Sequence, residues 1–283
     1  QRPRTRAFNR NSKLHNITMH TLAISEQGTS VHAEGDLFAI HRGTHVLRQV
    51  RVAEVDQLLL FGRVEISSRA IALAVRRGVD VAWLTQSGLF RGRLLGRFTK
   101  NVALRLAQYR RTCEPAFCLR VATTLIAAKI RQQRQQLLRA QRSLQDADLA
   151  ETLGRLRLLK DRAATCTSLD SLRGLEGAAA AAYFSQFGKL LRNNKFAFSG
   201  RNRRPPRDEV NSLLSFGYAV LGSVIETEIY RCGLDPLLGF FHQPAYGRAS
   251  LMLDLLEEFR PTVDALVLRV VNRRQLSPGD FVR

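Results

Sequence analysis

Histidine and carboxylate side chains that could bind a metal ion gather near the C-terminal end of the chain. His242 is followed by the carboxylates Asp254, Glu257 and Glu258. Imidazole nitrogen and carboxylate oxygen are ligands of Mg²⁺ and Mn²⁺, and a divalent cation held by them can promote the cleavage or joining of phosphodiesters. The spacing therefore indicates a candidate metal site for phosphodiester chemistry.

The carboxylates of this segment differ in their position on a predicted helix. Asp254 and Glu257 are three residues apart and project from the same face, whereas Glu258 is rotated by about 100° and is expected to lie outside the site. We expect the acidic face to point into a cleft. The alternative is that Asp254 or Glu257 simply forms an ion pair with an arginine. The stripe expected to face the core instead comprises Leu251, Leu255 and Phe259.

A third ligand is expected from another helix. Glu176 is the best candidate, because Gly177 and the alanines after it would let a second helix pack closely around its carboxylate. The alternative is that Glu176 is an exposed charge on an ordinary core helix. A lone histidine such as His242 is also more often structural than a ligand, but the carboxylates downstream of it favour metal binding.

These residues must be positioned by two regions with different apolar periodicity. The first, residues 19–95, has the short period of strands and one helix at 67–77, and it predicts a β-rich N-terminal domain whose first four strands form a meander. We expect its strands at 21–25, 31–34, 36–41, 46–50, 55–61 and 79–84.

The second region, residues 96–283, has a period of about 3.6 residues throughout. It predicts a larger all-α C-terminal domain that carries the metal site and the catalytic residues, so the fold class is α+β. Its helices are expected at 101–111, 116–143, 146–162, 172–191, 210–232, 250–259 and 261–272.

The charge of the chain points to a nucleic-acid partner. The net charge is +20, and nearly all of the 44 basic residues are arginine, whose planar fork suits bidentate phosphate contacts. Codon bias or an anionic membrane surface are the alternatives. A loop at 193–207 interrupts the helices and is either a phosphate contact or merely solvated. The predicted DNA-binding residues are Arg201, Arg203, Arg204, Arg248 and Arg260.

Targeting and cysteine patterns suit a cytoplasmic protein. Residues 1–18 read as a flexible basic tail or linker without the apolar stretch of a secretory signal, and a chain that begins with Gln1 suggests preceding sequence. No apolar run is long enough for a membrane span. The four cysteines lack CxxC spacing, which suits a reducing compartment and excludes a zinc ribbon.

Several segments together resemble a known family. The segments at residues 176–184, 206–218, 233–242 and 250–261 are similar in order and spacing to CRISPR-associated protein one, the integrase that inserts new spacers. Segments at 59–67 and 78–92 resemble the β domain of that family. The resemblance covers the chain from about Met19 to its C-terminus.

This resemblance implies an enzyme and names its residues. It implies a metal-dependent DNA endonuclease and integrase of CRISPR adaptation, in which a 3′-hydroxyl attacks a repeat phosphodiester. The ligands of Mg²⁺ or Mn²⁺ carry over to Glu176, His242 and Glu257, which would also be the catalytic residues. Asp254 lies beside the site, and Arg260 follows one helical turn after the last ligand.

The resemblance also implies partners. These are double-stranded DNA (spacer precursor and CRISPR repeat), a second copy of the chain held through the β domain, and the small second CRISPR-associated protein. Relatives can be fused to a RecB-like CRISPR exonuclease or a reverse transcriptase, and that exonuclease can also be separate. Gly222 stands where many relatives have a tyrosine, so neither a tyrosine nucleophile nor a stacking role is assigned at that position. A non-catalytic helical protein that binds DNA or RNA is the alternative, and no membrane partner is expected.

Overall fold

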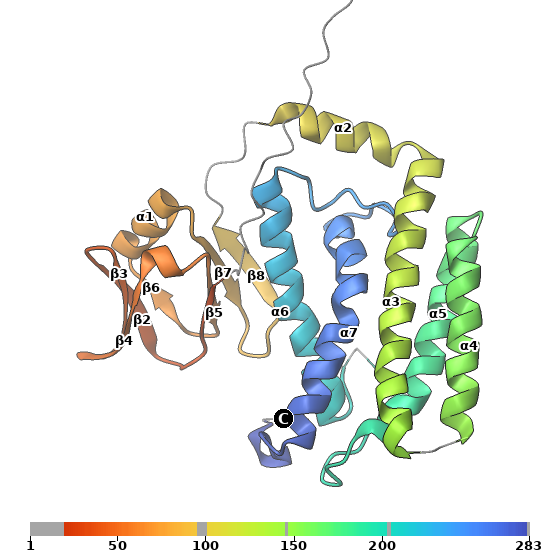
Figure 1. Cartoon of the computed structure of the whole chain (residues 1–283). Coiled ribbons are helices and arrows are strands. Elements are labelled where there is room, and N and C mark those ends of the chain that lie inside the picture. Colours follow the sequence, from red (N-terminus) through yellow and green to blue (C-terminus); the bar gives the residue numbers. More distant parts are fainter. Residues whose placement is uncertain (1–19, 95–100, 145–146, 203–204, 282–283) are drawn as a thin grey trace, which may run out of the picture. The chain divides into compact units, whose positions relative to one another are not determined.

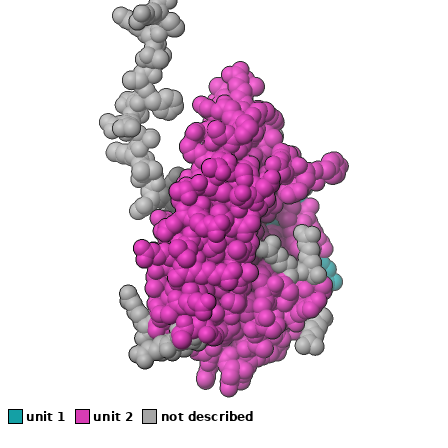
Figure 2. Space-filling model, turned by 90° about the vertical axis from the view of Figure 1, so that its right-hand side faces the viewer, with its two compact units in different colours: residues 1–83, 92–96 teal, residues 84–91, 97–283 magenta. Residues whose placement is uncertain are grey.

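The chain folds into two compact units. The computed structural model describes residues 20–94, 101–144, 147–202 and 205–281, so the predicted tail at 1–18 lies outside the described residues. The first unit covers residues 1–83 and 92–96, and the second covers residues 84–91 and 97–283 (Figure 2). Strands dominate the first and helices the second, which confirms the predicted α+β class with a larger helical C-terminal part (Figure 1).

The strands form two four-stranded sheets rather than one meander. The first four predicted strands do not all pair in sequence, because β1 leaves the others and pairs in parallel with β5, a strand buried along its whole length. Only β2, β3 and β4 make the expected antiparallel meander. The short strand β6 and the strand β8 were not predicted. The sheets have the order β1 (Thr21–Ile24), β5 (Gln57–Phe61), β7 (Asp80–Leu84), β8 (Phe90–Leu94), and β4 (His45–Arg51), β3 (Leu37–Arg42), β2 (Thr29–Glu34), β6 (Glu65–Ile66).

Helix α1 (Ser68–Arg77) begins and ends where its sequence dictates. The Ser67 side chain accepts a hydrogen bond from the amide of Ala70, which caps the first turn. Gly78 ends the helix with φ of 70°, a left-handed conformation that glycine adopts without steric cost.

The helical unit is built around α3, which packs against α4, α5 and α7, while α6 packs against α7 (Figure 1). Ile126, Leu156, Tyr183, Leu214 and Val271 contribute to one continuous apolar core between these helices. In the described part of the chain, no helix combines the length and hydropathy that a membrane crossing would require. The helices are α2 (Val102–Thr112), α3 (Pro115–Leu144), α4 (Ala147–Ala164), α5 (Leu169–Phe187), α6 (Glu209–Cys232) and α7 (Ser250–Asn272).

Helix α7 is one helix of 23 residues, although two were predicted on either side of Arg260. Pro261 lacks an N–H and removes the helical bond to the carbonyl four residues earlier, that of Glu257. Packing keeps the helix continuous, because Pro261 is buried and its own carbonyl accepts a hydrogen bond from the Gln136 side chain of α3. Pro261 therefore interrupts the helical hydrogen-bond pattern at the level of Glu257, a candidate ligand.

Candidate functional site

Two of the predicted ligands meet at a buried lysine. Lys129 of α3 donates to Oε1 of Glu176 on α5 and to Oε2 of Glu257 on α7, each at 2.5 Å. The Lys129 and Glu257 side chains are 4% and 7% exposed, while that of Glu176 is 23% exposed. Three helices distant in sequence therefore bring two carboxylates to one cation.

Glu257 is held as an anion by two basic side chains. Arg260, one turn later on α7, donates from Nε to Oε1 of Glu257 at 3.0 Å. Burial by itself would raise the pKa of Glu257, but the charges of Lys129 and Arg260 outweigh it and lower the pKa to about 2. Glu257 is thus ionised at neutral pH although it is buried.

His242 is oriented by Asp254. The buried Asp254 carboxylate accepts from the backbone amides of Phe240, Phe241 and His242 at 2.5, 2.9 and 2.8 Å. Its Oδ1 is also 2.7 Å from Nδ1 of the His242 ring, which is partly exposed. One carboxylate thus fixes both the loop before α7 and the plane of the imidazole.

The residues fit a divalent metal in their chemistry. Histidine ligands of metals usually donate one ring N–H to a carboxylate and bind with the other nitrogen, and the Nδ1 contact with Asp254 leaves Nε2 for this purpose. Two carboxylates and one imidazole suit Mg²⁺ or Mn²⁺. Among the described residues no three such side chains come close enough together to hold an ion. The ligand set of Glu176, His242 and Glu257 therefore stays a prediction.

A buried polar layer lies behind the carboxylates. The guanidinium of Arg260 lies 4.7 Å from the centre of the Tyr218 ring, and the Tyr218 hydroxyl donates to Oδ1 of Asp264. Asp264 is fully buried, and its Oδ2 has no hydrogen-bond partner among the described residues. Burial raises the pKa of Asp264 to about 6, although the Tyr218 hydroxyl and other neighbours lower it in part.

The predicted DNA-binding arginines differ in their surroundings. Arg201 is half-buried and donates to Oδ1 of Asn211 at 2.7 Å and to Oγ of Ser215 at 3.0 Å, so it also holds the preceding loop against α6. Arg248 is exposed. Arg203 and Arg204 lie outside the described residues.

The structure corrects the predicted orientation of α7. Asp254 and Glu257 face the core and not an open cleft, whereas Phe259, expected in the core, is 45% exposed. Burial of the carboxylates is possible because amides, Lys129 and Arg260 satisfy them. Gly177 is exposed and not needed for close packing, since an added Cβ would meet nothing within 4 Å.

Sequence reasoning missed Lys129 as part of this cluster. It lies within the predicted helix at 116–143, between alanines and Ile130, and it is one of only six lysines in the chain. A lysine is almost never fully buried unless it is paired. An isolated lysine in an apolar stretch of an arginine-rich protein was therefore the available signal.

Comparison with known proteins defines the class of this molecule. The family model described as CRISPR associated protein Cas1 matches residues 22–283, nearly the whole chain and both of its units. A CRISPR-associated exonuclease Cas4/endonuclease Cas1 fusion of Geobacter sulfurreducens is 39% identical over 262 residues, which are 89% of this chain and 47% of that protein. CRISPR-associated endonuclease Cas1 2 of Rhodospirillum rubrum is 36% identical over 276 residues, 94% of this chain and 79% of that protein.

A solved structure gives the same fold. A chain of a Cas6-RT-Cas1–Cas2 complex superimposes with a TM-score of 0.79 and 24% identity, covering 94% of this chain and 29% of that one. The chain thus spans 47% of the Geobacter sulfurreducens protein and 29% of the chain in the solved complex. It belongs to the Cas1 family.

Proposed function

We propose that this chain is a metal-dependent DNA endonuclease and integrase of CRISPR adaptation, which inserts new spacers into an array. The observation that supports it is the convergence of Glu176 and Glu257 on Lys129, together with a histidine that Asp254 holds by one ring nitrogen. Two carboxylates from different helices around one buried ammonium are costly to a fold, and such groups are expected where chemistry requires them.

Three residues would hold Mg²⁺ or Mn²⁺: Glu176 and Glu257 through carboxylate oxygens and His242 through Nε2. When bound, such an ion polarises a phosphodiester and lowers the pKa of an attacking hydroxyl or water. In that arrangement Glu176, His242 and Glu257 are the catalytic residues, and residues 96–283 form the catalytic domain. In the proposed integration reaction the 3′-hydroxyl of a spacer attacks a phosphodiester of the repeat. The same reaction with water as the attacking group would give endonuclease activity.

The other residues of the cluster have positioning roles. Lys129 partly neutralises both carboxylates and keeps them side by side. Arg260 restrains Oε1 of Glu257, and Asp254 keeps the His242 ring in one orientation. Pre-organised groups of this kind lower the cost of assembling a reactive geometry.

The partners are part of the same proposal. Double-stranded DNA is expected because the chain carries a net charge of +20, with Arg201, Arg203, Arg204, Arg248 and Arg260 among the contacts. We propose a homodimer formed through residues 19–95 and a complex with the small second CRISPR-associated protein. The names of the Cas4/Cas1 fusion and of the Cas6-RT-Cas1–Cas2 complex support fused or separate partners, including a RecB-like exonuclease.

The test is strand transfer by the purified chain with its small partner protein. A labelled duplex with a free 3′-hydroxyl is incubated with a plasmid that contains the repeat, with and without Mn²⁺. We expect metal-dependent joining that Glu176→Gln and His242→Ala abolish while duplex binding remains. Glu258→Gln is the matched control, because Glu258 follows Glu257 directly and is only half-buried.

The alternative is a non-catalytic helical protein that binds DNA or RNA. Duplex binding without any metal-dependent joining or cleavage, in the presence of the partner protein, would favour it. Full activity in both Glu176→Gln and His242→Ala would remove the active-site assignment.

A further inference from the structure

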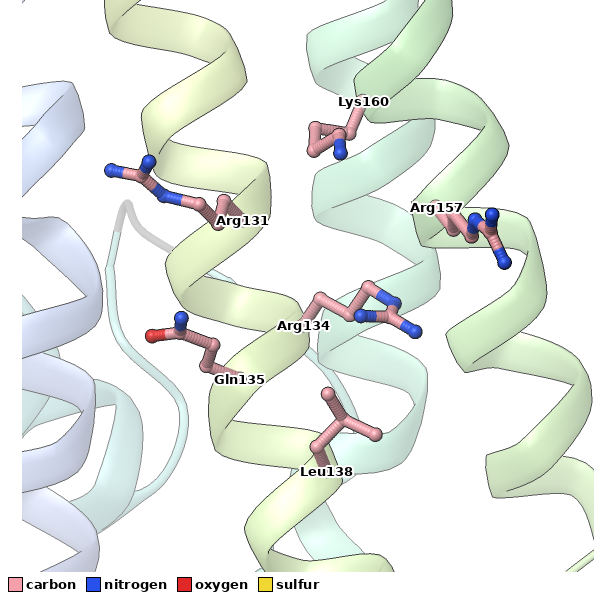
Figure 3. A pocket seen from close by; sticks show the side chains of 6 residues that line it. All are labelled: Arg131, Arg134, Gln135, Leu138, Arg157 and Lys160. Atoms are coloured by element: carbon pink, nitrogen blue, oxygen red, sulfur yellow. The ribbon is translucent and has the colours of Figure 1, made fainter.

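A basic groove lies between α3 and α4, apart from the carboxylate cluster. It has a volume of about 360 Å³. Arg134 extends from α3 towards α4, and Lys160 lies on the facing side of α4 (Figure 3). The groove is lined by Arg131, Arg134, Gln135, Leu138, Arg157 and Lys160.

The lining of the groove is charged with one sign only. Four of its six residues are basic and none is acidic. Lys160 pairs with Asp161 at 2.9 Å, but Arg131 and Arg157 form no ion pair with any described residue, and both are exposed. An anion in the groove would be attracted by these basic side chains, because no lining residue carries a negative charge.

The groove is a fixed feature of the helix pair. Nε of Arg134, one of the lining residues, donates to the carbonyl of Leu153 on α4 at 3.1 Å, which connects the two helices. Leu137 and Leu156, one on each helix, are fully buried beneath it. Its basic side chains are therefore spaced by two packed helices and not by a loop.

The groove and the carboxylate cluster use different faces of α3. Lys129 and Arg131 are two residues apart, which corresponds to about 200° around a helix. Lys129 is 3% exposed among α5 and α7, whereas Arg131 is exposed. The groove thus forms a second polar feature with its own ligand chemistry.

We propose that this groove binds backbone phosphates of duplex DNA, a contact that rests on the proposed function and adds a location to it. Three of its four cations are arginines, whose guanidinium forks match phosphate oxygens. Along α3 the lining extends from Arg131 to Leu138, roughly 10 Å at 1.5 Å per residue. That length allows contact with more than one phosphate, because each strand of a duplex carries one phosphate per roughly 3.4 Å of helix axis.

The test removes one exposed arginine from each helix. In Arg131→Gln/Arg157→Gln the groove loses two charges, and Arg134 is left intact because it joins the helices. The matched control is Arg139→Gln/Arg155→Gln, which removes two exposed arginines from the same two helices outside the groove. Both variants have the same net charge, and equal thermal midpoints verify that both are folded.

Affinity for a fluorescent duplex is measured by anisotropy at a series of salt concentrations. We expect the groove variant to bind more weakly, with the slope of log K against log salt reduced by about 2, because each lost phosphate contact reduces it by about 0.9. The control should keep the slope of the wild type. Arg131→Lys/Arg157→Lys should also keep most of it, because the charge remains.

The outcomes separate the groove from the proposed function. Equal losses in the groove variant and its control would show an effect of net charge alone and overturn the groove. An unchanged slope in the groove variant would also overturn the proposed DNA contact. An acidic protein would then be the alternative ligand of the groove. If the wild-type protein itself bound no duplex, both the groove proposal and the proposed function would be overturned.

Discussion

Lys129 and Glu257 are joined across 128 residues of sequence by a 2.5 Å contact between Nζ and Oε2, with both side chains less than one tenth exposed. The same ammonium contacts Glu176. A buried charge that loses its partner is expensive, so each member of this group depends on the others. The contact therefore couples the folding of α3 and α7 to the geometry of the candidate metal site.

The first prediction concerns the substitution Lys129→Met. Without the ammonium, two adjacent carboxylates remain without their shared cation, and we expect the free energy of unfolding to fall by about 3–5 kcal/mol in metal-free buffer. A divalent cation would compensate the carboxylates instead. Mn²⁺ should therefore raise the thermal midpoint of Lys129→Met more than that of the wild type, as measured by scanning calorimetry.

Lys189→Met is the control for this prediction. Lys189 is exposed and pairs with Asp148 at 3.2 Å, so its loss should cost at most about 1 kcal/mol and should not alter the response to Mn²⁺. An identical Mn²⁺ shift in the wild type and Lys129→Met would show that the two carboxylates do not share a metal.

The second prediction concerns Asp254→Asn. In the wild type, the Asp254 carboxylate accepts from backbone amides of the loop and contacts the His242 ring. The asparagine side chain has an NH₂ group that cannot accept these hydrogen bonds, so the loop and the ring lose their fixed positions. Loss of such a carboxylate partner typically lowers metal affinity by about 10–100-fold. We expect this loss in Mn²⁺ titration calorimetry, with duplex affinity unchanged.

Glu258→Gln should leave the Mn²⁺ affinity at its wild-type value, because it lies outside this hydrogen-bond group. Wild-type Mn²⁺ affinity in Asp254→Asn would contradict the positioning role of Asp254.

The third prediction compares two glycines. A Cβ on Gly239 would lie 2.7 Å from Oδ2 of Asp254 and 2.8 Å from the backbone carbon of Ser250, so Gly239→Ala must displace the loop that holds His242. We expect a loss of about 1–3 kcal/mol in the free energy of unfolding and a loss of strand transfer. Gly177→Ala, at an open helical position, should instead stabilise the protein by about 0.5–1 kcal/mol.

Chemical denaturation of both variants measures this difference. A Gly239→Ala variant as stable and active as the wild type would mean that the close approach of the loop to Asp254 is dispensable.

The helices of this fold could be predicted well from the sequence because their periodicity is local. The predicted helix at 210–232 differs from α6 by one residue, since Asp208 caps one end and Gly233 terminates the other. Pro261 was misjudged because its effect depends on burial against α3, which no local pattern contains. The pairing of β1 with β5 was missed for the same reason, as it joins strands that are not adjacent in sequence.

The ligands of the candidate site stay a prediction, and what the structure tests is the direction in which their side chains point. Helical phase places Asp254 and Glu257 on one face and Glu258 apart from them, and in the structure the first two are buried while Glu258 is half-buried. That face can be buried because its carboxylates find partners, which are Arg260 one turn along the same helix, Lys129 of α3 and the loop amides of Phe240 and Phe241. The pairing of Glu257 with Arg260 agrees with the alternative of an arginine partner. Lys129 and the loop amides are not neighbours of this helix in sequence, so a local pattern does not predict that the face is buried.

The fourth prediction concerns the pH dependence of stability through Asp264. Burial raises the pKa of its carboxyl from 3.8 to about 6 in the folded protein, against the lowering effects of Tyr218, Lys129, Tyr183 and Arg260. The folded state then binds the proton more tightly than the unfolded state between about pH 4 and 6. The stabilisation is fully present below pH 4 and is lost as the pH rises through 6, to a total of about 3 kcal/mol at 1.36 kcal/mol per unit.

Asp264→Asn removes this titration without changing the volume of the side chain. Denaturant unfolding at pH 4 and pH 7 gives the stability difference between wild type and variant at each pH, and groups that titrate alike in both proteins, such as Glu257, cancel in it. We expect the difference to move by about 2 kcal/mol in favour of the variant between the two values, because part of the total is already lost at pH 4. A difference that is independent of pH would show that Asp264 has an ordinary pKa in the folded protein and is compensated by its neighbours.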